Sequence, residues 1–512
     1  MKRRSVVLAM PLLAAMLPLA GWTAVAQAQG SSTGGGGGTL TLGLTLPATT
    51  FVAADMAFDN ESPYGQAVYD SLLKADPVGT ILPSLATQWS YNADKTVLTL
   101  TLRSDVKFTD GTPFNADVAV QNLKRFQSGS SPNKSFLASL ADAKAIDDTH
   151  LQITLKGADP AFLTYLSQNA GYQASPAAFG KPDAKTTPVG SGPYMIDAAS
   201  TVIGSSYVFD KNPNYWDRAN QPYDKLVLKV FNDPTAMLNA VKGKQLNGAR
   251  LINNDFIEQV KGANYDLVAW EPNWTGLLLL DREGKMSPAL KDVRVRQAIN
   301  YAFDKQALIK AYGKGYGTPT TQIFPPKSVA FDAALDSKYD YNPTKAKQLL
   351  AEAGYANGFT LTMPTTASVG RTLYSLIGQQ LKDVGITAQF TDAGTNFLSD
   401  ILAPKYPVTW LALKQDPTDW QVVNYELSPT ASWNPFKTTD PKVTELIAKY
   451  HDAKSDNDAT AAIKELNAYI VDQAWFAPWY RQKSHYATDP KTEVKPQVGS
   501  PYPYLWNFKP KA

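Results

Sequence analysis

The stretch VLTLTLRSDVKFTDG, residues 97–111, alternates apolar and polar side chains and ends in a Thr-Asp-Gly turn. Successive side chains of a β-strand point to opposite faces, so the apolar residues of one parity would share one face. These residues are Leu98, Leu100, Leu102, Val106 and Phe108. The pair Asp110-Gly111 has the chemistry of a turn. We therefore predict a half-buried strand that leads into a hairpin.

Other runs of the chain extend this pattern into a mixed fold. Strand-like segments such as THLQITL (149–155) and KLVLKVF (225–231) are interleaved with helical patterns, which favours an α/β or α+β organisation. In VRVRQAINYAFDK the apolar residues follow the helical spacing, and we expect them to be buried: Val295, Ala298, Ile299, Ala302 and Phe303. In YNPTKAKQLLAEAGY we expect Asn342 to cap a helix that Gly354 ends.

Composition narrows the chemistry that the chain can perform. The 512 residues are enough for several domains, and 44% apolar residues supply a large core. The sequence has no cysteine, so neither disulfides nor thiolate metal sites are available to it. Its three histidines, His150, His451 and His485, are too far apart in sequence for a familiar metal-ligand spacing. We expect no metal site and no cofactor.

The charge balance is close to neutral. The chain has 49 basic and 46 acidic residues, a formal net charge of +3. Lys2, Arg3 and Arg4 at the start of the chain account for this excess. The remainder has no net-charge signature of nucleic-acid binding, and we expect no nucleic-acid partner.

Residues 1–28 have the pattern of a signal peptide. The basic start precedes the apolar segment VVLAMPLLAAMLPLA (6–20), and AVAQAQ offers cleavage after Ala26 or Ala28. The apolar segment is shorter than a bilayer span and contains Pro11 and Pro18, which argues against a membrane anchor. We expect a periplasmic or extracellular protein, with export by the general or the twin-arginine route.

A Gly- and Ser-rich segment, residues 29–38, follows and has the composition of a flexible tether. Just before it, LAGW (19–22) is similar to the lipid-attachment box of bacterial lipoproteins, but Trp22 stands where that box has its cysteine. No lipid can be attached there, so we expect a protein without a lipid anchor.

The opening stretch resembles a known family. Ala86, Asp94, the stretch itself and TPFNADVAVQNLKR (112–125) together are similar to the characteristic segment of the peptide/nickel-type (family 5) solute-binding proteins of ABC importers. The resemblance continues in that family's order with four further motifs: PVGSGPY (188–194), KNPNYW (211–216), DVRVRQAINYAFDK (292–305) and YNPTKAKQLLAEAGY (341–355). Each motif also has a structural reading as a turn or a helix face. The motifs therefore identify the scaffold without placing a ligand.

This resemblance implies an α/β, periplasmic-binding-protein-like fold of type II, the large cluster with an extra subdomain. Two lobes joined by two crossing strands would close over a solute. By motif position, domain I would be discontinuous and comprise residues 39–72, 189–270 and 486–512. Residues 73–188 would form domain II, the extra subdomain, and residues 271–485 would form domain III, the opposite lobe. The opening stretch would then have a structural role in domain II.

The resemblance also implies where the ligand would bind. The segment 408–436 of domain III matches a strand that offers backbone groups to an extended ligand in the family's peptide binders. We expect ligand contacts from a set of candidate residues in and around the cleft: Trp410, Leu413, Gln415, Asp416, Asp419, Trp420, Trp274, Asn60 and Tyr64. For each tryptophan, packing in the core is an equally good explanation.

One of these positions departs from the family. Where many of its peptide binders have an aspartate that pairs with the peptide's α-ammonium, the spacing from Trp410 to Asp416-Pro417 places Leu413. A leucine cannot pair with an ammonium, and an unpaired buried charge is costly. We therefore expect ordinary free-amine dipeptides to bind weakly, unless Asp416 or Asp419 replaces the missing acid.

The function implied is capture of a peptide or peptide-like solute, as a monomer, and delivery to the permease subunits of an ABC importer. A non-peptide solute such as a sugar, an opine or a metal chelate remains open. An enzyme is the less favoured alternative. The Gly-x-Ser-x-Gly elbow and the phosphate loop are absent from the sequence, and Asp416/Asp419 could serve as glycosidase carboxylates only at a suitable separation. An adhesin or chaperone would instead expose an apolar patch.

Overall fold

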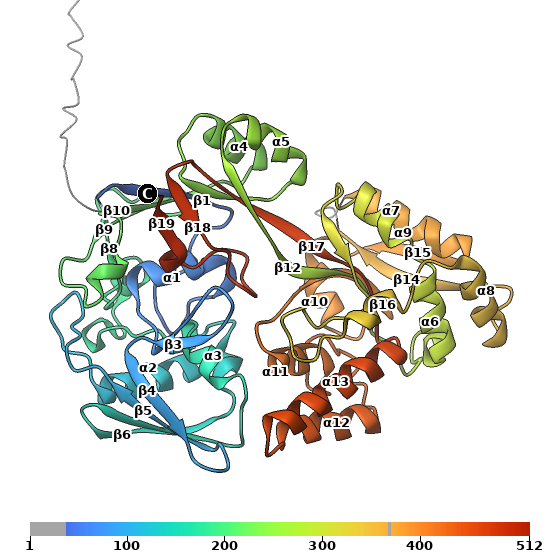
Figure 1. The fold of residues 1–512 in the computed structure, drawn as a ribbon, viewed down its shortest axis with the longest axis horizontal. Coiled ribbons are helices and arrows are strands. Elements are labelled where there is room, and N and C mark those ends of the chain that lie inside the picture. Colours follow the sequence, from blue (N-terminus) through green and yellow to red (C-terminus); the bar gives the residue numbers. More distant parts are fainter. Residues whose placement is uncertain (1–36, 367–369, 512) are drawn as a thin grey trace, which may run out of the picture. The chain divides into compact units, whose positions relative to one another are not determined.

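The computed structural model describes residues 37–366 and 370–511, and Figure 1 shows their arrangement. The predicted signal peptide, its cleavage sites and residues 29–36 of the tether lie outside the described residues. Residues from Gly37 onward form a single unit of mixed helices and strands. This confirms the predicted α/β class.

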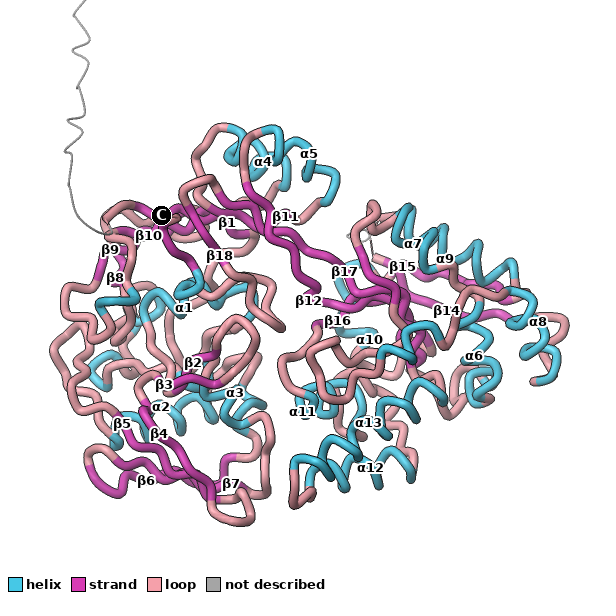
Figure 2. Tube along the Cα trace, viewed as in Figure 1, coloured by secondary structure: helices cyan, strands magenta, loops and turns pink. Residues whose placement is uncertain are grey.

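A nine-stranded sheet is the largest element of the fold. Its main order is β16-β12-β17-β11-β1-β10-β9-β8, and β13 pairs with β17 (Figure 2). The strands are β1 (Thr39–Leu44), β8 (Tyr194–Ile196), β9 (Ser206–Lys211), β10 (Lys225–Val230), β11 (Gly248–Leu251), β12 (Asp266–Leu279), β13 (Gly317–Pro319), β16 (Val408–Lys414) and β17 (Phe476–Thr488). β1 is parallel to β10 and β11, whereas β12 is antiparallel to both β16 and β17.

The two longest strands, β12 and β17, connect the two lobes of the unit. In Figure 1 they run side by side from the lobe that contains β1 into the lobe that contains β14, β15 and β16. Their pairing shifts register between Trp270 and Asn273, so the ladder is irregular midway along the crossing. We call the part that contains β13–β16 and α6–α13 the second lobe, and the rest the first lobe. The predicted pair of crossing strands is confirmed.

The first lobe contains a separate four-stranded sheet with the order β4-β5-β7-β6. Its strands are β4 (Ala86–Tyr91), β5 (Val97–Leu102), β6 (Leu140–Asp147) and β7 (His150–Leu155). Beside it lie β2 (Leu73–Ala75), β3 (Ile81–Pro83), α2 (Ala116–Ser128) and α3 (Phe162–Leu166). The remaining first-lobe elements are α1 (Ser62–Val68), α4 (Pro234–Lys242), α5 (Ile257–Gly262), β18 (Thr492–Val494) and β19 (Phe508–Pro510).

The opening stretch forms β5 and the hairpin that follows it. The five apolar residues that share one parity are all buried in the core of this sheet, as predicted. The backbone NH of Thr112 donates to Oδ1 of Asp110 over 2.9 Å. Gly111 has a φ of 87°, a conformation that favours glycine. The predicted strand and turn are confirmed.

The second lobe carries most of the helices. They are α6 (Val293–Tyr301), α7 (Lys305–Ala311), α8 (Pro343–Glu352), α9 (Arg371–Asp383), α10 (Phe397–Ile401), α11 (Asp419–Val422), α12 (Pro441–His451) and α13 (Asp456–Asp472), with the parallel pair β14 (Phe359–Thr365) and β15 (Ile386–Asp392). The predicted apolar stripe is buried, although α6 ends at Tyr301. Asn342 caps α8 by accepting from the NH of Lys345, and Gly354 follows with a φ of 89°.

Two of the motifs meet in the core of the first lobe. The buried carboxylate of Asp70 accepts hydrogen bonds from Ser191 at 3.0 Å, Tyr215 at 3.0 Å and Trp216 at 2.9 Å. A Cβ atom on Gly190 would lie 1.9 Å from the carbonyl oxygen of Val68, so only glycine fits there. Both motifs therefore have structural roles, which agrees with their structural reading.

The residue bounds of domains I, II and III remain predictions.

Among the helices of residues 37–366 and 370–511, none is long and apolar enough to cross a bilayer.

Candidate ligand-binding cleft

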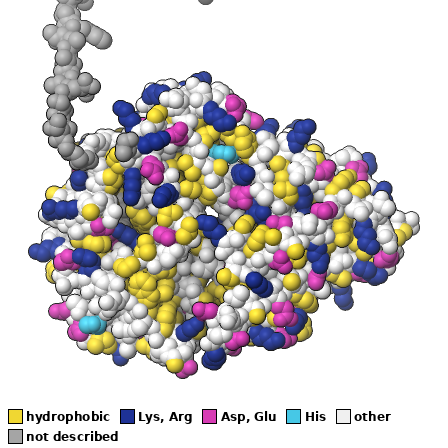
Figure 3. All heavy atoms as spheres, viewed as in Figure 1, with side chains coloured by type: hydrophobic (Ala, Val, Ile, Leu, Met, Phe, Trp, Pro, Cys, Tyr) yellow, Lys and Arg dark blue, Asp and Glu magenta, His cyan; other side chains and the backbone are white. Residues whose placement is uncertain are grey.

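A cavity of about 250 Å³ lies between the two lobes. Figure 3 shows a face of the molecule that is hollowed along the boundary between the lobes. The first lobe contributes Asp59, Pro132, Asn133, Ser135 and Phe136 to the cavity wall. The second lobe contributes Leu413, Lys414, Asp416, Tyr425, Glu426, Ser432 and Trp433. Because both lobes line it, the cavity has the position expected for a ligand that the lobes enclose.

An ion-pair triad spans this cavity. The Nζ atom of Lys414 lies 2.9 Å from Oδ1 of Asp59 and 3.5 Å from Oδ1 of Asp416. Lys414 is at the end of β16, and Asp59 begins a short 3-10 turn, Asp59–Glu61, in the first lobe. The Asp416 side chain is only 6% exposed, whereas those of Lys414 and Asp59 are 25% and 38% exposed. The triad therefore joins a buried carboxylate to groups that solvent can reach.

The surroundings of the triad shift the protonation of two of its members. Burial raises the pKa of Asp416 to about 6, although the Lys414 ammonium opposes this shift. Burial alone would lower the pKa of Lys414, but the carboxylates of Asp59 and Asp416 outweigh it and hold that pKa above its usual value. Lys414 is therefore charged, and Asp416 titrates close to neutral pH.

A third carboxyl group, that of Glu426, lines the same cavity. Its side chain is 2% exposed, and its Oε2 atom has no hydrogen-bond partner. Burial raises the pKa of Glu426 well above its usual range, and the charge of Asp416 adds to this effect. Without a ligand, burial therefore favours the neutral form of this carboxyl.

A second cavity, of about 380 Å³, adjoins the same segment of the second lobe. The side chain of Gln415 lines this second cavity, whereas its neighbours Lys414 and Asp416 line the first. The backbone NH of Gln415 donates to the carbonyl of Pro272 over 2.7 Å, and its buried Nε2 has no hydrogen-bond partner. The other wall residues are mostly apolar: Pro77, Ala269, Trp270, Glu271, Pro325, Pro326, Lys327, Pro496, Gln497 and Val498.

Three of the aromatic candidates are core residues in this structure. Trp274 is completely buried against Phe476, with ring centroids 5.7 Å apart. Tyr64 is also completely buried, and its hydroxyl donates to the carbonyl of Leu46 over 2.9 Å. The Trp410 indole, 8% exposed, donates to Thr275 Oγ1 over 2.9 Å. None of the three lines either cavity, so we do not keep them in the proposed site.

The remaining candidates lie at or near the boundary between the lobes. Asn60 is half-buried beside Asp59. Trp420 is partly buried, packs against apolar clusters of both lobes and lies 5.0 Å from the ring of His451. Burial raises the pKa of Asp419, whose carboxyl group accepts hydrogen bonds from the Ser328 hydroxyl and the Ala330 backbone. Asp419 does not line either cavity.

Leu413, Gln415 and Asp416 are therefore the candidates that the structure brings to the two cavities. Sequence reasoning missed Asp59, Lys414, Tyr425 and Glu426. The last three lie inside the segment 408–436, which was expected to line the cleft, so this segment could have pointed to them. Nothing in the sequence around Asp59 indicated that it would lie opposite β16.

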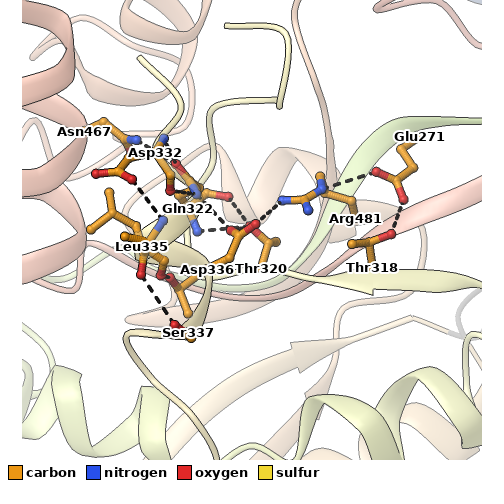
Figure 4. A network of polar contacts seen from close by, with 12 residues as sticks. Glu271, Thr318, Thr320, Gln322, Asp332, Leu335, Asp336, Ser337, Asn467 and Arg481 are labelled. Atoms are coloured by element: carbon orange, nitrogen blue, oxygen red, sulfur yellow. Dashed lines mark hydrogen bonds and ion pairs between the residues drawn. The ribbon is translucent and has the colours of Figure 1, made fainter. Parts of the chain in front are cut away.

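Polar contacts also tie the crossing strands to the second lobe. Figure 4 shows Arg481 of β17 between two carboxylates. Its Nε lies 3.2 Å from Glu271 of β12, and its Nη1 lies 3.0 Å from Asp336. Asp336 also accepts from Thr320 at 2.7 Å and Gln322 at 2.8 Å. This network holds both strands in a fixed relation to the second lobe near the register shift.

In the part of the chain that the structure describes, there is no group of His, Asp and Glu residues that could hold a metal ion. The walls of the two cavities offer carboxyl, ammonium, amide and aromatic groups. These groups can bind a solute through hydrogen bonds, charge and stacking.

Comparison with known proteins agrees with this architecture. The glutathione-binding protein GsiB of Escherichia coli (strain K12) is 32% identical over 357 residues, which cover 66% of this chain and 67% of that protein. NikA from Brucella suis, solved in complex with Fe(III)-EDTA, has a TM-score of 0.80 at 21% identity and covers 92% of this chain and 100% of its own. DppA from Helicobacter pylori, solved with the peptide STSA, has a TM-score of 0.77 at 20% identity, covering 93% and 99%. The two structures show the fold alone.

The family itself follows from the sequence matches. The profile described as bacterial extracellular solute-binding proteins, family 5 Middle, matches residues 80–435. This match includes the opening stretch, the motifs and most of the segment that lines the cavities. The chain therefore belongs to the bacterial extracellular solute-binding proteins of family 5.

Proposed function

We propose that this chain captures a peptide or peptide-like solute in the cavity between its lobes and delivers it to an ABC importer. The observation that carries the proposal is the cavity of about 250 Å³ whose walls come from both lobes. Segment 413–416 comprises the end of β16 and the two residues after it, and it lines both cavities, as a strand that meets an extended ligand would. The names of GsiB, a glutathione-binding protein, and of DppA in complex with a peptide support the same class.

A non-peptide solute is the alternative. NikA, which has the same fold, was solved with Fe(III)-EDTA, and a fold alone does not choose a ligand. Binding of short peptides distinguishes the two proposals. If the solute is a peptide, a pool of short peptides contains ligands for the protein, whereas if the solute is not a peptide, the pool contains none.

Several further properties belong to the proposal. The chain would act without catalysis, as a monomer, with the permease subunits of its importer as protein partners and no nucleic acid. It would be exported, cleaved after Ala26 or Ala28, and located in the periplasm or outside the cell. Trp22 at the place of a lipobox cysteine supports the absence of a lipid anchor. The intact mass of the secreted protein tests both points, since an acyl chain would add a defined mass.

The experiment that tests the function is native mass spectrometry of protein purified without denaturation. We expect an adduct of peptide mass that survives desalting, is released by acid and is chemically unchanged after release. A pool of di- to tetrapeptides should reload the stripped protein and raise its melting temperature. Recovery of cleaved products would indicate an enzyme. Stripped protein that ignores the peptide pool but binds sugars, opines or metal chelates would support the alternative.

A further inference from the structure

We infer that the cavity between the lobes selects a solute that carries a cationic group, an ammonium or a guanidinium, and that Asp416 and Glu426 receive it while Lys414 stays paired with Asp59. The inference rests on the proposed function, because it names the chemistry of the solute bound at the same site. It assigns the specificity to Asp416, which the sequence offered as a replacement acid, and to Glu426, which the sequence did not indicate.

The first argument is the balance of charge in the cavity. Three carboxyl groups and one ammonium line it. With Asp59 and Asp416 ionised and Lys414 protonated, the cavity has one negative charge in excess. A single cationic group would neutralise it, whereas an anionic group would meet two carboxylates at short range. Charge complementarity of this kind selects between ligands even where it adds little affinity.

Carboxyl oxygens of Asp416 and Glu426 lack good hydrogen-bond donors. Oε2 of Glu426 is buried and has no well-aligned hydrogen-bond donor; the indole NH of Trp274, itself unpaired, is the nearby donor that opposes the rise in the pKa of this carboxyl. The buried carboxylate of Asp416 faces the Lys414 ammonium at 3.5 Å, which is longer than a good hydrogen bond. Buried acceptors without donors are unfavourable, and charge-assisted donors satisfy them best. The N–H groups of an ammonium or guanidinium are donors of that kind.

The third argument is that Lys414 is already engaged. Its ammonium donates to Asp59 over 2.9 Å and lies 3.5 Å from Asp416. A carboxylate of the solute would have to compete with both for the same ammonium. Lys414 therefore discriminates against anionic groups at this end of the cleft, although it is itself a cation.

Binding of a cationic group at these two carboxyls should release protons. Burial raises the pKa of Glu426 well above its usual range and that of Asp416 to about 6, so an arriving cation would lower both and release protons. The other charged and titratable groups around these two carboxyls are Asp59, Lys414, Tyr165 and Tyr425, and Tyr504 lies near Lys414 and Asp59. Burial raises the pKa of each of these tyrosines, so they stay neutral.

This inference reverses the expectation drawn from Leu413. That expectation held unless another acid replaced the missing aspartate, and the structure places Asp416 in the cavity wall together with Glu426. Asp419, the other candidate, lies outside both cavity walls. Free-amine peptides are therefore expected to bind well.

The test compares two forms of one peptide pool by calorimetry, one with free amines and one N-acetylated. We expect the free-amine pool to bind at least tenfold more tightly. Asp416→Asn and Glu426→Gln should each remove most of this preference. Asp419→Asn is the matched control and should leave the preference unchanged, because this carboxyl lies outside the cavity walls. Near-ultraviolet circular dichroism confirms that each variant is folded.

The outcomes separate the inference from the proposed function. If both pools bind equally, or the acetylated pool binds more tightly, the inference is wrong and the proposed function stands. If neither pool binds, the peptide reading fails, and methylammonium chloride against sodium chloride at equal ionic strength then tests the cation site directly. Methylammonium should raise the melting temperature of the wild type more than that of Glu426→Gln. An equal response of the two proteins would overturn the inference.

Proton release provides an independent readout. Calorimetry of the free-amine pool at pH 7, in two buffers with different ionisation enthalpies, measures the protons released on binding. We expect net release from the wild type and a smaller release from Glu426→Gln. A wild type that binds with no proton release would contradict the assigned role of Glu426.

Discussion

Lys414 of the second lobe lies 2.9 Å from Asp59 of the first lobe, so an ion pair connects the two lobes across the cavity. Asp59 has a φ of 43°, which is uncommon for a residue other than glycine. Strained backbone of this kind persists where the surrounding structure requires it, and it often marks a functional position. The ion pair thus joins a strained turn to the end of β16, at the point where the solute is proposed to bind.

Replacing Asp416 with asparagine should stabilise the ligand-free protein at neutral pH. The pKa of this acid rises from its ordinary value to about 6 on folding, so ionisation opposes the folded state. The folded protein binds more protons than the unfolded chain between about pH 4 and pH 6, and stability falls as pH rises through that range. Asp416→Asn should therefore raise the free energy of unfolding by roughly 3 kcal/mol at pH 7.5, as an order of magnitude.

Urea unfolding at pH 7.5 and at pH 4 measures this effect. The gain should be clear at pH 7.5 and should largely disappear at pH 4, where the native acid is already protonated. Asp94→Asn, in an exposed turn, is the control and should change little at either pH. A destabilised variant at pH 7.5 would mean that the contact between Asp416 and Lys414 outweighs burial.

Trp274 should matter for stability and not for ligand selection. It is completely buried against Phe476, so Trp274→Ala should lower the free energy of unfolding by about 3–5 kcal/mol. Trp274→Phe keeps most of the packing and removes only the indole NH beside Glu426, so affinity for the co-purified solute should stay close to that of the wild type. Loss of affinity in a folded Trp274→Phe variant, measured by calorimetry, would restore this residue to the binding site.

Substitution of Arg481 should destabilise the protein more than substitution at most other positions of the crossing strands. Its side chain is 5% exposed and pairs with Glu271 and Asp336, whose side chains are 20% and 21% exposed. Arg481→Met would leave both carboxylates unpaired, which should destabilise the protein by roughly 2–4 kcal/mol. Arg481→Lys keeps the charge and should cost less. Equal unfolding midpoints for Arg481→Met and the wild type would show that the network does not stabilise the crossing.

Local patterns in the sequence predicted much of the fold. The alternation in residues 97–111 indicated β5 and its buried face, and the capping chemistry of Asn342 indicated the start of α8. These features depend on neighbouring residues, so spacing alone reveals them. The Gly190 requirement is different, because it arises from the carbonyl of Val68, which is distant in sequence.

The site was less predictable, because it is built from contacts between distant segments. The segment 408–436 was identified, but its aromatic residues, which looked most suitable for a ligand, include Trp410, which packs into the core. Asp59 meets Lys414 only because the two lobes face one another, and no local pattern encodes that meeting. A buried carboxyl such as Glu426 likewise becomes unusual only through its surroundings.

The most direct test of the central claim, that a solute is enclosed between the lobes, is the distance between them with and without that solute. The chain has no cysteine, so spin labels attach only at introduced positions. Ile146→Cys on β6, where the native side chain is 54% exposed, and Lys454→Cys after α12 place one label on each lobe. Pulsed electron–electron double resonance on the stripped protein measures the distribution of distances between the two labels. The mean distance should shorten, and the distribution should narrow, when the co-purified solute saturates binding. An unchanged distance distribution at saturation would contradict the account.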